Sequence, residues 1–267
     1  MTEPSVIPAA ESPTGSATMS PAMADLRAYP RYLYDSVALE LGQRVWEIGV
    51  GYGTYTEWLR ADGKQVLATD VDIDCVTRIA HRFSGDDGVQ SAHVDLNQPA
   101  TVSALAGFHA DSVLCFNVLE HIQDDVAALT AIRSAVAPDA CLGLIVPAHQ
   151  HLYGRMDAEA GHFRRYSRGS LHGVLTAAGW RIGRLRYRNL IGAAGWWYHS
   201  HCRKSAGLAD RSINWQMRQM DVWLPRFARI TDPLCGWIAG LSVLAIAYAG
   251  PAGDDVTSTA ATHSAVN

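Results

Sequence analysis

The chain has few of the features that mark membrane-spanning or secreted proteins. Its apolar run from Trp237 to Ala249 is too short for a membrane-spanning helix, which needs about 20 residues. The first twenty residues are mainly Pro, Ser, Thr, Ala and Glu, without the basic start and apolar centre of a signal peptide. We therefore expect a cytoplasmic protein with no membrane span.

Cysteine and lysine are also scarce. The five cysteines are odd in number and form no Cys-x-x-Cys pair, and Cys115 and Cys141 fall in expected strands. Buried, reduced thiols are the simplest interpretation. Lys64 and Lys204 are the only lysines, and the formal net charge is -4. This charge argues against a general nucleic-acid binder, so the partner we expect is a small molecule.

The stretch from Val45 to Gly53 is the most informative part of the chain. Val45, Trp46 and Ile48 form a short apolar run that stops at a glycine-rich turn, as a buried strand does. Residues 54–57 follow with the Thr-x-x-Glu form of a helix capping box. A strand, a glycine turn and a helix in this order form the first half of a nucleotide-binding unit.

The spacing of the glycines distinguishes between nucleotide-binding families. A dinucleotide site needs Gly-x-Gly-x-x-Gly, whereas this turn has Gly49, Gly51 and Gly53, and Glu47 precedes it. The Glu-x-Gly-x-Gly-x-Gly pattern resembles the first motif of class I S-adenosylmethionine (SAM) methyltransferases. Glycines let the backbone approach a ligand closely, and we expect Glu47 and the Gly49 carbonyl to hold the cationic methionyl ammonium. An ordinary tight turn in an α/β protein is the alternative.

An acidic residue follows each of the next two expected strands. Asp70 lies about twenty residues after the first glycine, an offset at which an acid can hydrogen-bond both ribose hydroxyls. Its alternative role is to cap the next helix, and Asp72 is better placed for that. In the resembled family, an acid at the position of Asp95 meets the adenine amino group, and the apolar residue at Leu96 packs on the ring.

The segment after the expected strand 112–116 reads Asn-Val-Leu-Glu-His, from Asn117 to His121. It resembles the Asn/Ser-x-Leu-Glu-His signature of many small-molecule SAM methyltransferases, which implies that Asn117 lies beside the reacting sulfur and methyl group. His121 is a candidate for contact with the methyl acceptor. Glu120 and His121 could be catalytic, or they could be a hydrogen-bonded pair that holds the loop.

A long loop rich in titratable side chains follows the expected strand 141–146. Its pattern, Val-Pro-Ala…Leu-Tyr-Gly…Asp…Gly-His-Phe-Arg-Arg-Tyr-Ser, closely resembles one bacterial subfamily of class I SAM methyltransferases, except that Phe163 stands where the subfamily has Tyr. Connections of this length are usually functional, and this one follows a central strand, at the edge where substrates bind.

An acceptor that must lose a proton needs a positioned base, and the loop offers several. The candidates for this base are, in order, His162, Tyr153, His151 and Glu159, while Arg165 and Tyr166 are expected to contact the acceptor. The two His-x-His pairs, His149/His151 and His199/His201, have no acidic partner at a fixed helical offset, and alternate residues of a strand face opposite ways. No metal site is expected.

Residues 25–41 are expected to form a leading helix, broken or restarted early at Pro30. Tyr29 and Tyr32 lie in its first part. Their side chains either pack over the sheet edge or belong to a flap over the cofactor that also contacts the acceptor.

Residues 192–233 are rich in aromatic side chains, including Trp196 and Trp197. We expect this segment to be a helical insertion before the last strand. It either caps the acceptor pocket, with both tryptophans contacting the acceptor, or forms a dimer contact. A homodimer is therefore one expected assembly.

The motifs follow one another from Val45 to Tyr166 in the order found in class I SAM methyltransferases. The resemblance implies an α/β, Rossmann-like sheet of seven strands, one of them antiparallel, with helices on both faces and the helical insertion before the last strand. The expected organisation is a disordered tail over residues 1–21, one domain over 22–250 and a second disordered tail over 251–267.

The expected activity is methyl transfer from SAM, with S-adenosylhomocysteine as the product. Walls rich in Trp, Tyr and His suit a flat aromatic acceptor. The favoured hypothesis is C3-methylation of the indole of a tryptophan-derived compound, such as a cyclodipeptide, to give a pyrroloindoline. O- or N-methylation of another small metabolite, or of a sugar- or lipid-linked acceptor, is the alternative. A SAM-binding regulator without chemistry is a more remote one, and an NAD-dependent oxidoreductase is disfavoured by the glycine spacing.

Overall fold

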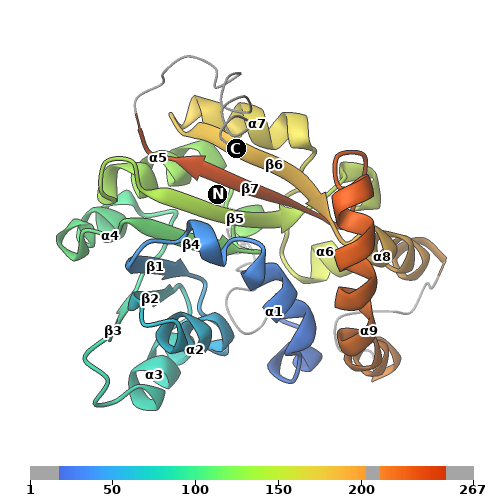
Figure 1. Ribbon diagram of the computed structural model, residues 1–267, viewed down its shortest axis with the longest axis horizontal. Helices are drawn as coiled ribbons and strands as arrows, with labels where there is room; N and C mark the ends of the chain where they lie inside the picture. The colour runs from blue at the N-terminus through green and yellow to red at the C-terminus, as the bar shows by residue number, and fades with distance from the viewer. Residues whose placement is uncertain (1–17, 203–210, 251–267) are drawn as a thin grey trace, which may run out of the picture.

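A computed structural model describes residues 18–202 and 211–250. Its centre is a seven-stranded sheet with the order β3-β2-β1-β4-β5-β7-β6, in which β7 is antiparallel to both of its neighbours (Figure 1). This confirms the expected sheet with one antiparallel strand. The strands are β1 (Arg44–Ile48), β2 (Gln65–Asp70), β3 (Val89–His93), β4 (Ser112–Phe116), β5 (Cys141–Pro147), β6 (Arg181–Arg188) and β7 (Ser242–Tyr248).

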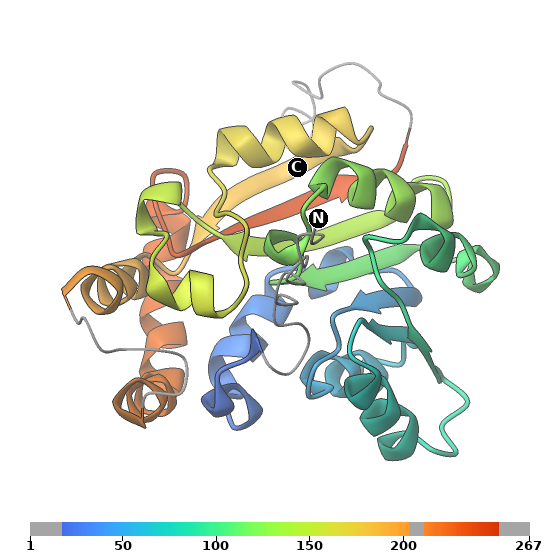
Figure 2. The ribbon, with the colours of Figure 1, turned by 180° about the vertical axis from the view of Figure 1, so that it is seen from behind.

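Helices cover both faces of the sheet (Figure 2). The helices are α1 (Ala28–Asp35), α2 (Thr54–Ala61), α3 (Ile73–Arg82), α4 (Pro99–Ser103), α5 (Asp125–Ala135), α6 (Arg155–Glu159), α7 (Arg168–Ala177), α8 (Leu190–Cys202) and α9 (Arg211–Cys235). Short 3-10 turns are η2 (Pro21–Ala24), η3 (Ala38–Glu40), η4 (Ala106–Phe108), η5 (Leu119–His121) and η6 (Gln150–Leu152). Among these helices, none combines the length and the apolar character needed to cross a bilayer.

Alternating side chains of the strands divide the core into two layers. On β1, Val45 packs with the residues of α1, α2 and α3, whereas Trp46 and Ile48 pack with those of α4, α5 and α7. Successive side chains of a strand point to opposite faces, so the burial of four consecutive residues of β1, from Val45 to Ile48, indicates a sheet covered on both sides. The indole N–H of Trp46 donates to Thr69 Oγ1 on the neighbouring strand (2.8 Å).

The parallel strands β1, β2, β4 and β5 end at one edge of the sheet. The glycine turn, Asp70, Asn117 and the loop after β5 all follow these ends, and ligands of open α/β sheets bind there. The fold therefore brings the predicted cofactor and acceptor residues to one edge, although they are far apart in the sequence.

The N-terminal segment is held by the helical insertion. The expected single helix over 25–41 is instead α1 followed by η3. Asp221 on α9 caps α1 from outside, because its carboxylate accepts the backbone N–H groups of Arg27, Ala28 and Tyr29 at 3.0, 2.9 and 2.8 Å. These amides are the ones that a helix start leaves without intrahelical partners.

The expected tail over residues 1–21 lies outside the described residues as far as residue 17, and so does the tail over 251–267. Residues 18–21 differ from that expectation. Ser20 is buried and donates from Oγ to Asn214 Oδ1 on α9 (2.6 Å), and the same oxygen accepts the N–H of Ala22 (2.8 Å). No local sequence pattern indicates these contacts, since their partners are almost two hundred residues away.

Candidate active site

Two cavities lie side by side at the carboxyl edge of the sheet. The first, of about 210 Å³, lies among the glycine turn and the ends of β2, β3 and β4. The second, of about 230 Å³, lies between η5, the 147–166 loop, α1 and α8. Asn117 and His121 belong to both walls, as do Thr18, Met19 and Met23 of the N-terminal segment. The two cavities are therefore direct neighbours, separated only by these side chains.

The glycine turn forms the floor of the first cavity through Gly49 and Gly51. Gly49, Gly51 and Gly53 have φ values of 77°, 49° and 76°, a region that side chains other than Gly rarely adopt. A Cβ at Gly49 would collide with Val118, and a Cβ at Gly53 would collide with Ile79 of α3. Gly53 is not a wall residue; its role is to begin α2 and to let α3 pack closely.

Asp70 is positioned at the wall of the first cavity by two backbone amides. Its carboxylate accepts from Gly51 N–H at 3.0 Å and from Asp72 N–H at 2.9 Å. Burial raises its pKa above the ordinary value, although these hydrogen bonds oppose the rise. A carboxylate has about four lone-pair sites, so the group can still accept a hydrogen bond from a ribose hydroxyl. Asp72 caps α3 instead, as expected.

Asp95 and Leu96 lie on the opposite side of this cavity. Burial alone would raise the pKa of Asp95, but hydrogen bonds from Asn97 and Gln98 hold it below the ordinary value. Leu96 is 5% exposed and offers an apolar contact. An ionised carboxylate, which can accept hydrogen bonds, beside an apolar side chain suits an adenine ring with an exocyclic amino group.

Glu47 lies behind the cavity wall. Its side chain is 1% exposed, Oε2 accepts from the Thr56 hydroxyl at 2.6 Å, and Oε1 has no partner among the described residues. Burial raises the pKa of this carboxyl from 4.5 to about 8. An unpaired buried carboxyl oxygen beside the glycine turn fits a site for a cationic ligand group. The expected capping box is not present, since α2 begins after Gly53 without a side-chain cap.

The raised pKa of Glu47 predicts a pH-dependent stability. Because the folded-state pKa lies above the unfolded one, the folded protein retains a proton that the unfolded chain loses between about pH 4.5 and 8. Stability should therefore fall as the pH rises through this window, by up to roughly 1.4 kcal/mol per pH unit. Glu47→Gln should make this slope shallower, most clearly between about pH 7 and 8, because buried Glu120, whose pKa is raised to about 7, contributes to the slope at lower pH. Urea unfolding at pH 5, 6.5 and 8 measures it, and parallel curves for both proteins would show that Glu47 does not titrate there.

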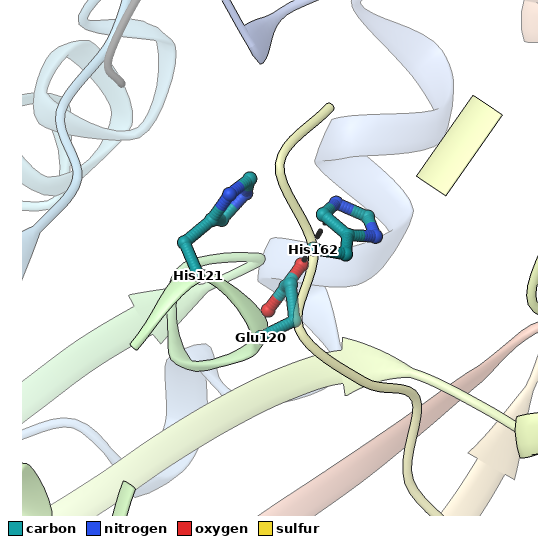
Figure 3. A group of neighbouring side chains, drawn as sticks. All are labelled: Glu120, His121 and His162. Atoms are coloured by element: carbon teal, nitrogen blue, oxygen red, sulfur yellow. Dashed lines mark ion pairs between the residues drawn. The ribbon is translucent and has the colours of Figure 1, made fainter. Parts of the chain in front are cut away.

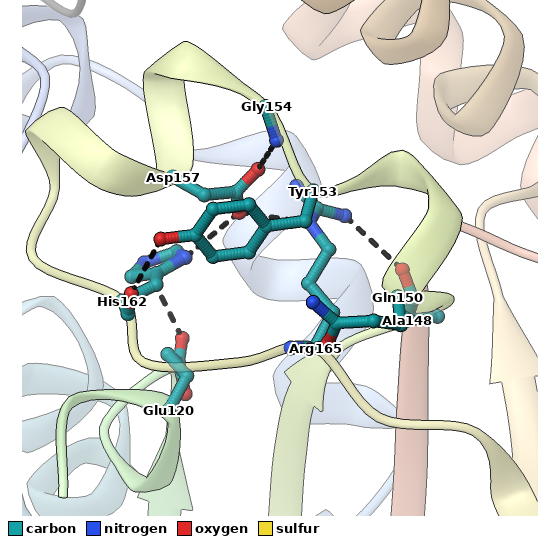
Figure 4. Close-up of polar contacts among 8 residues, drawn as sticks. All are labelled: Glu120, Ala148, Gln150, Tyr153, Gly154, Asp157, His162 and Arg165. Carbon is teal, nitrogen blue, oxygen red and sulfur yellow. Dashed lines mark hydrogen bonds and ion pairs between the residues drawn. The ribbon is translucent and has the colours of Figure 1, made fainter. Parts of the chain in front are cut away.

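A buried carboxylate in the loop after β5 lies behind the wall of the second cavity and holds two of its wall residues (Figure 4). Asp157 is fully buried, and its Oδ1 accepts from His162 Nδ1 at 2.8 Å and from Arg165 Nε at 2.7 Å. Its Oδ2 accepts the Gly154 N–H at 3.0 Å. Burial alone would raise the pKa of Asp157, but His162 and Arg165 hold it below the ordinary value. Asp157 is therefore ionised, and His162 Nδ1 must carry a proton to donate to it.

Glu120 and His121 lie next to His162 in the wall of the second cavity (Figure 3). Glu120 is fully buried, and neither carboxylate oxygen has a hydrogen-bond partner in the described residues. Its Oε1 lies 3.9 Å from His162 Nε2, and burial raises its pKa to about 7. Burial and the adjacent His162 lower the pKa of His121 to about 4. The ligand atoms of these three side chains lie within 4.8 Å of one another, so they could hold a metal ion.

Several residues that were predicted to contact the methyl acceptor lie in the wall of the second cavity. Tyr29 comes from α1, Arg165 from the loop and Trp196 from α8. The Arg165 guanidinium lies over the Trp196 ring at 4.7 Å. Tyr153 is outside the wall, but its hydroxyl donates to the backbone carbonyl of His162 at 2.8 Å, so it positions that residue.

Five residues that were predicted for the site lie outside both cavities, and the position of each has a physical reason. The Tyr32 hydroxyl donates to Asp232, and the Tyr166 hydroxyl donates to Asp125, so both side chains are buried structural groups. Trp197 is 49% exposed, since neighbouring helix residues point about 100° apart. Glu159 pairs with Arg155 one turn away, and His151 is exposed beside His149. None of the five lines a cavity.

Similarity in sequence to known proteins covers mainly the residues that surround the first cavity. Residues 46–142 match a family model described as a methyltransferase domain. Ubiquinone biosynthesis O-methyltransferases of Xanthomonas euvesicatoria and Xanthomonas axonopodis are 33% identical over 109 residues and 36% identical over 112 residues. Each match covers 40% of this chain and 45% of the relative, so the chain spans less than half the length of these curated relatives.

Solved structures share the fold over most of the chain. A SAM-dependent methyltransferase from Archaeoglobus fulgidus has a TM-score of 0.53 at 14% identity and covers 82% of this chain and 91% of its own. The [4+2]-cyclase SpnF has a TM-score of 0.55 at 18% identity, with coverages of 84% and 80%. Phosphoethanolamine N-methyltransferase 2 of Haemonchus contortus, solved with SAM, has a TM-score of 0.54 at 16% identity, with coverages of 84% and 53%.

The strand order and these matches show a methyltransferase domain over residues 46–142 and the fold of the SAM-dependent methyltransferases. Its methyltransferase domain begins at Trp46 in β1 and includes the glycine turn, Asp70, Asp95 and Asn117. SAM is the cofactor of this class. The positive-φ glycines, the acid at the end of β2 and the unpaired Glu47 oxygen are compatible with it.

Proposed function

We propose that the protein transfers the methyl group of SAM, held in the first cavity, to a small aromatic acceptor in the second. The observation that carries this proposal is the wall that the two cavities share at Asn117 and His121. When bound, SAM supplies an activated methyl group on a sulfonium, so the protein mainly has to align the acceptor and exclude water.

In this proposal, Asp70 binds the ribose, Asp95 and Leu96 bind the adenine, and Glu47 balances the methionyl ammonium. Asn117 has a φ of 54°, and its N–H donates to the Ile145 carbonyl at 2.8 Å. Its backbone is thus fixed between the two ligands. Met19 lies against the glycine turn, 3.1 Å from the place of a Cβ at Gly51, so the N-terminal segment covers the cofactor side.

His162 is the proposed base. Because the ionised Asp157 accepts from Nδ1, the lone pair of the neutral imidazole is on Nε2, which lies on the side of Glu120. A proton taken up by Nε2 gives an imidazolium between two carboxyl groups, which stabilise its charge. His121 has a low pKa, so it contacts the acceptor as a neutral ring.

The wall of the second cavity favours a flat acceptor with a large apolar surface. Tyr29, Met156, Trp196 and Met217 supply aromatic and thioether contacts. We favour an indole, methylated at C3, with His162 removing the proton that is lost when an adjacent amide nitrogen closes the ring at C2. O-methylation of a phenol is the second candidate, because the curated relatives are named as O-methyltransferases.

Turnover with panels of tryptophan cyclodipeptides, simple indoles, phenols and sugar nucleotides distinguishes these acceptors. The proposal predicts a methylated product from an indole in the first two panels, with the new methyl group on C3. Product only from phenols would exclude the indole acceptor and support O-methylation. Turnover only on sugar nucleotides or other non-aromatic compounds would exclude an aromatic acceptor.

Metal ions should not be required for this chemistry. If Nε2 of His162 is the base, it must be free, so removal of metal ions with EDTA should leave the rate unchanged. Added Zn²⁺ should inhibit, because Glu120, His121 and His162 offer it ligands. Rates measured before and after chelation test this. Loss of turnover with EDTA and its return with Zn²⁺ would instead assign these three side chains to a catalytic metal.

A further inference from the structure

The outward side of α9 is strongly apolar. Trp215, Trp223, Phe227, Ile230 and Leu234 on this helix, and Trp237 just after it, are between 51% and 69% exposed. We call these six residues the outer face of α9. The spacings of three and four from Trp223 to Leu234 place their side chains on one side of the helix. Figures 1 and 2 show α8 and α9 together at one end of the molecule.

The opposite side of α9 is anchored, so the helix cannot turn its apolar side inward. Asp221 caps α1, and Asn214 holds Ser20 and Ala22. Asp232 is 3% exposed and accepts the Asn189 N–H at 2.9 Å. The outer face of α9 is therefore a fixed surface, and contiguous exposed apolar surfaces of this kind mark interaction sites.

The charges around this face fit a protein partner better than a lipid surface. In the described part of α9, both aspartates point to α1 and β6, and Arg218 and Arg229 pair with Asp25 and Asp35. Arg226 lies over the Trp223 ring at 5.2 Å. Helices that bind anionic membranes carry many unpaired Lys and Arg on their polar side. Tryptophan, phenylalanine and arginine without lysine or acids are instead typical of the centre of a protein interface.

The amount of apolar surface fits a stable complex. Large aromatic and aliphatic side chains offer about 150–250 Å² each when fully exposed, so the outer face and its neighbours provide on the order of 800 Å², the share of one partner in a standard interface. The chain's own ends are poor candidates to cover it. Residues 1–17 and 251–267 contain mostly Ala, Ser, Thr, Pro and Gly, with Ile7 as their largest branched side chain.

We propose that the outer face of α9 binds the same face of a second copy of the chain, forming a homodimer with a two-fold axis. A self-complementary apolar helix face is the surface that such an axis requires. The dimer would brace α9, which holds the N-terminal segment and lends Met217 to the second cavity. The proposal is independent of which acceptor is methylated.

The mass of the full-length protein, measured by sedimentation equilibrium at micromolar concentrations, tests the proposal. Twice the chain mass of 28.9 kDa is expected for the wild type. The double variant Trp223→Glu/Ile230→Glu should sediment as a monomer with an unchanged circular dichroism spectrum. Leu39→Glu is the matched control, because Leu39 is 97% exposed on η3, and it should remain a dimer.

A monomeric wild type would overturn the proposal. If that monomer also sediments with vesicles of anionic phospholipid, the outer face of α9 is a lipid-binding surface. A dimer that persists in a folded double variant would place the interface elsewhere. If the double variant does not fold, Phe227→Arg alone gives the same comparison, and the wild-type mass needs no variant at all.

Discussion

Replacing Asp70 by alanine is expected to weaken SAM binding by about 5- to 150-fold. The buried carboxylate is held toward the first cavity by the amides of Gly51 and Asp72. Its loss leaves the ribose hydroxyls without their charged acceptor, which costs about 1–3 kcal/mol. Isothermal titration of SAM into both proteins measures the change.

Asp72→Ala is the control for damage to the local structure. Asp72 lies two residues away and caps α3 through the Asp74 N–H at 2.9 Å, but it is not part of the cavity wall. Its loss should lower the stability by about 1 kcal/mol and leave the SAM affinity within about twofold of wild type. Equal affinities in wild type and Asp70→Ala would refute the ribose assignment.

Replacing His162 by glutamine is expected to lower kcat by about 10²- to 10⁴-fold, the usual contribution of a general base. Glutamine can still donate to Asp157, so the hydrogen-bonded loop should persist. SAM affinity should not change, because His162 lies in the wall of the second cavity alone. Single-turnover kinetics with saturating SAM separates the chemical step from binding.

His151→Gln is the matched control for this variant. His151 is in the same loop but is exposed and lies outside both cavities. Its replacement should leave kcat within about twofold of wild type, as surface changes usually do. A full rate in His162→Gln would exclude it as the base, and an equal loss of SAM affinity would mean that the change acts through the structure.

The fold could be predicted well because its signals are local. Short apolar runs that end in glycine or an acid define the strands, and the spacing of Gly49, Gly51 and Gly53 separates this turn from a dinucleotide site. The same local logic places Asp70, Asp95 and Leu96 at strand ends, where the structure has them. In contrast, the capping box expected from Thr54 and Glu57 does not form, and no local pattern indicates that the hydroxyl of the neighbouring Thr56 donates to Glu47.

The acceptor side was harder to predict, because long-range partners decide it. Tyrosine is common in the walls of binding pockets, but Asp232 and Asp125 hold Tyr32 and Tyr166 in the core. Met19 and Met23 line both cavities, although their segment has the composition of a tail. Its position depends on Asn214 and Asp221, which no local pattern connects to it.

The fold alone does not establish methyl transfer, since a [4+2]-cyclase has the same architecture with a TM-score of 0.55. The evidence specific to this chain is the pair of cavities that meet at Asn117, with His162 held between Asp157 and Glu120. A SAM-binding regulator would need a cofactor site, but it would not need a second cavity beside it for a methyl acceptor.

The most direct test is to follow isotopically labelled methyl groups from SAM during incubation with the aromatic acceptor panels. We expect labelled acceptor and S-adenosylhomocysteine in equal amounts, and rates of formation of both lower by about 10²- to 10⁴-fold in His162→Gln while SAM binding persists. Binding of SAM without transfer of label to any aromatic acceptor, or a product that carries no labelled methyl group, would contradict it.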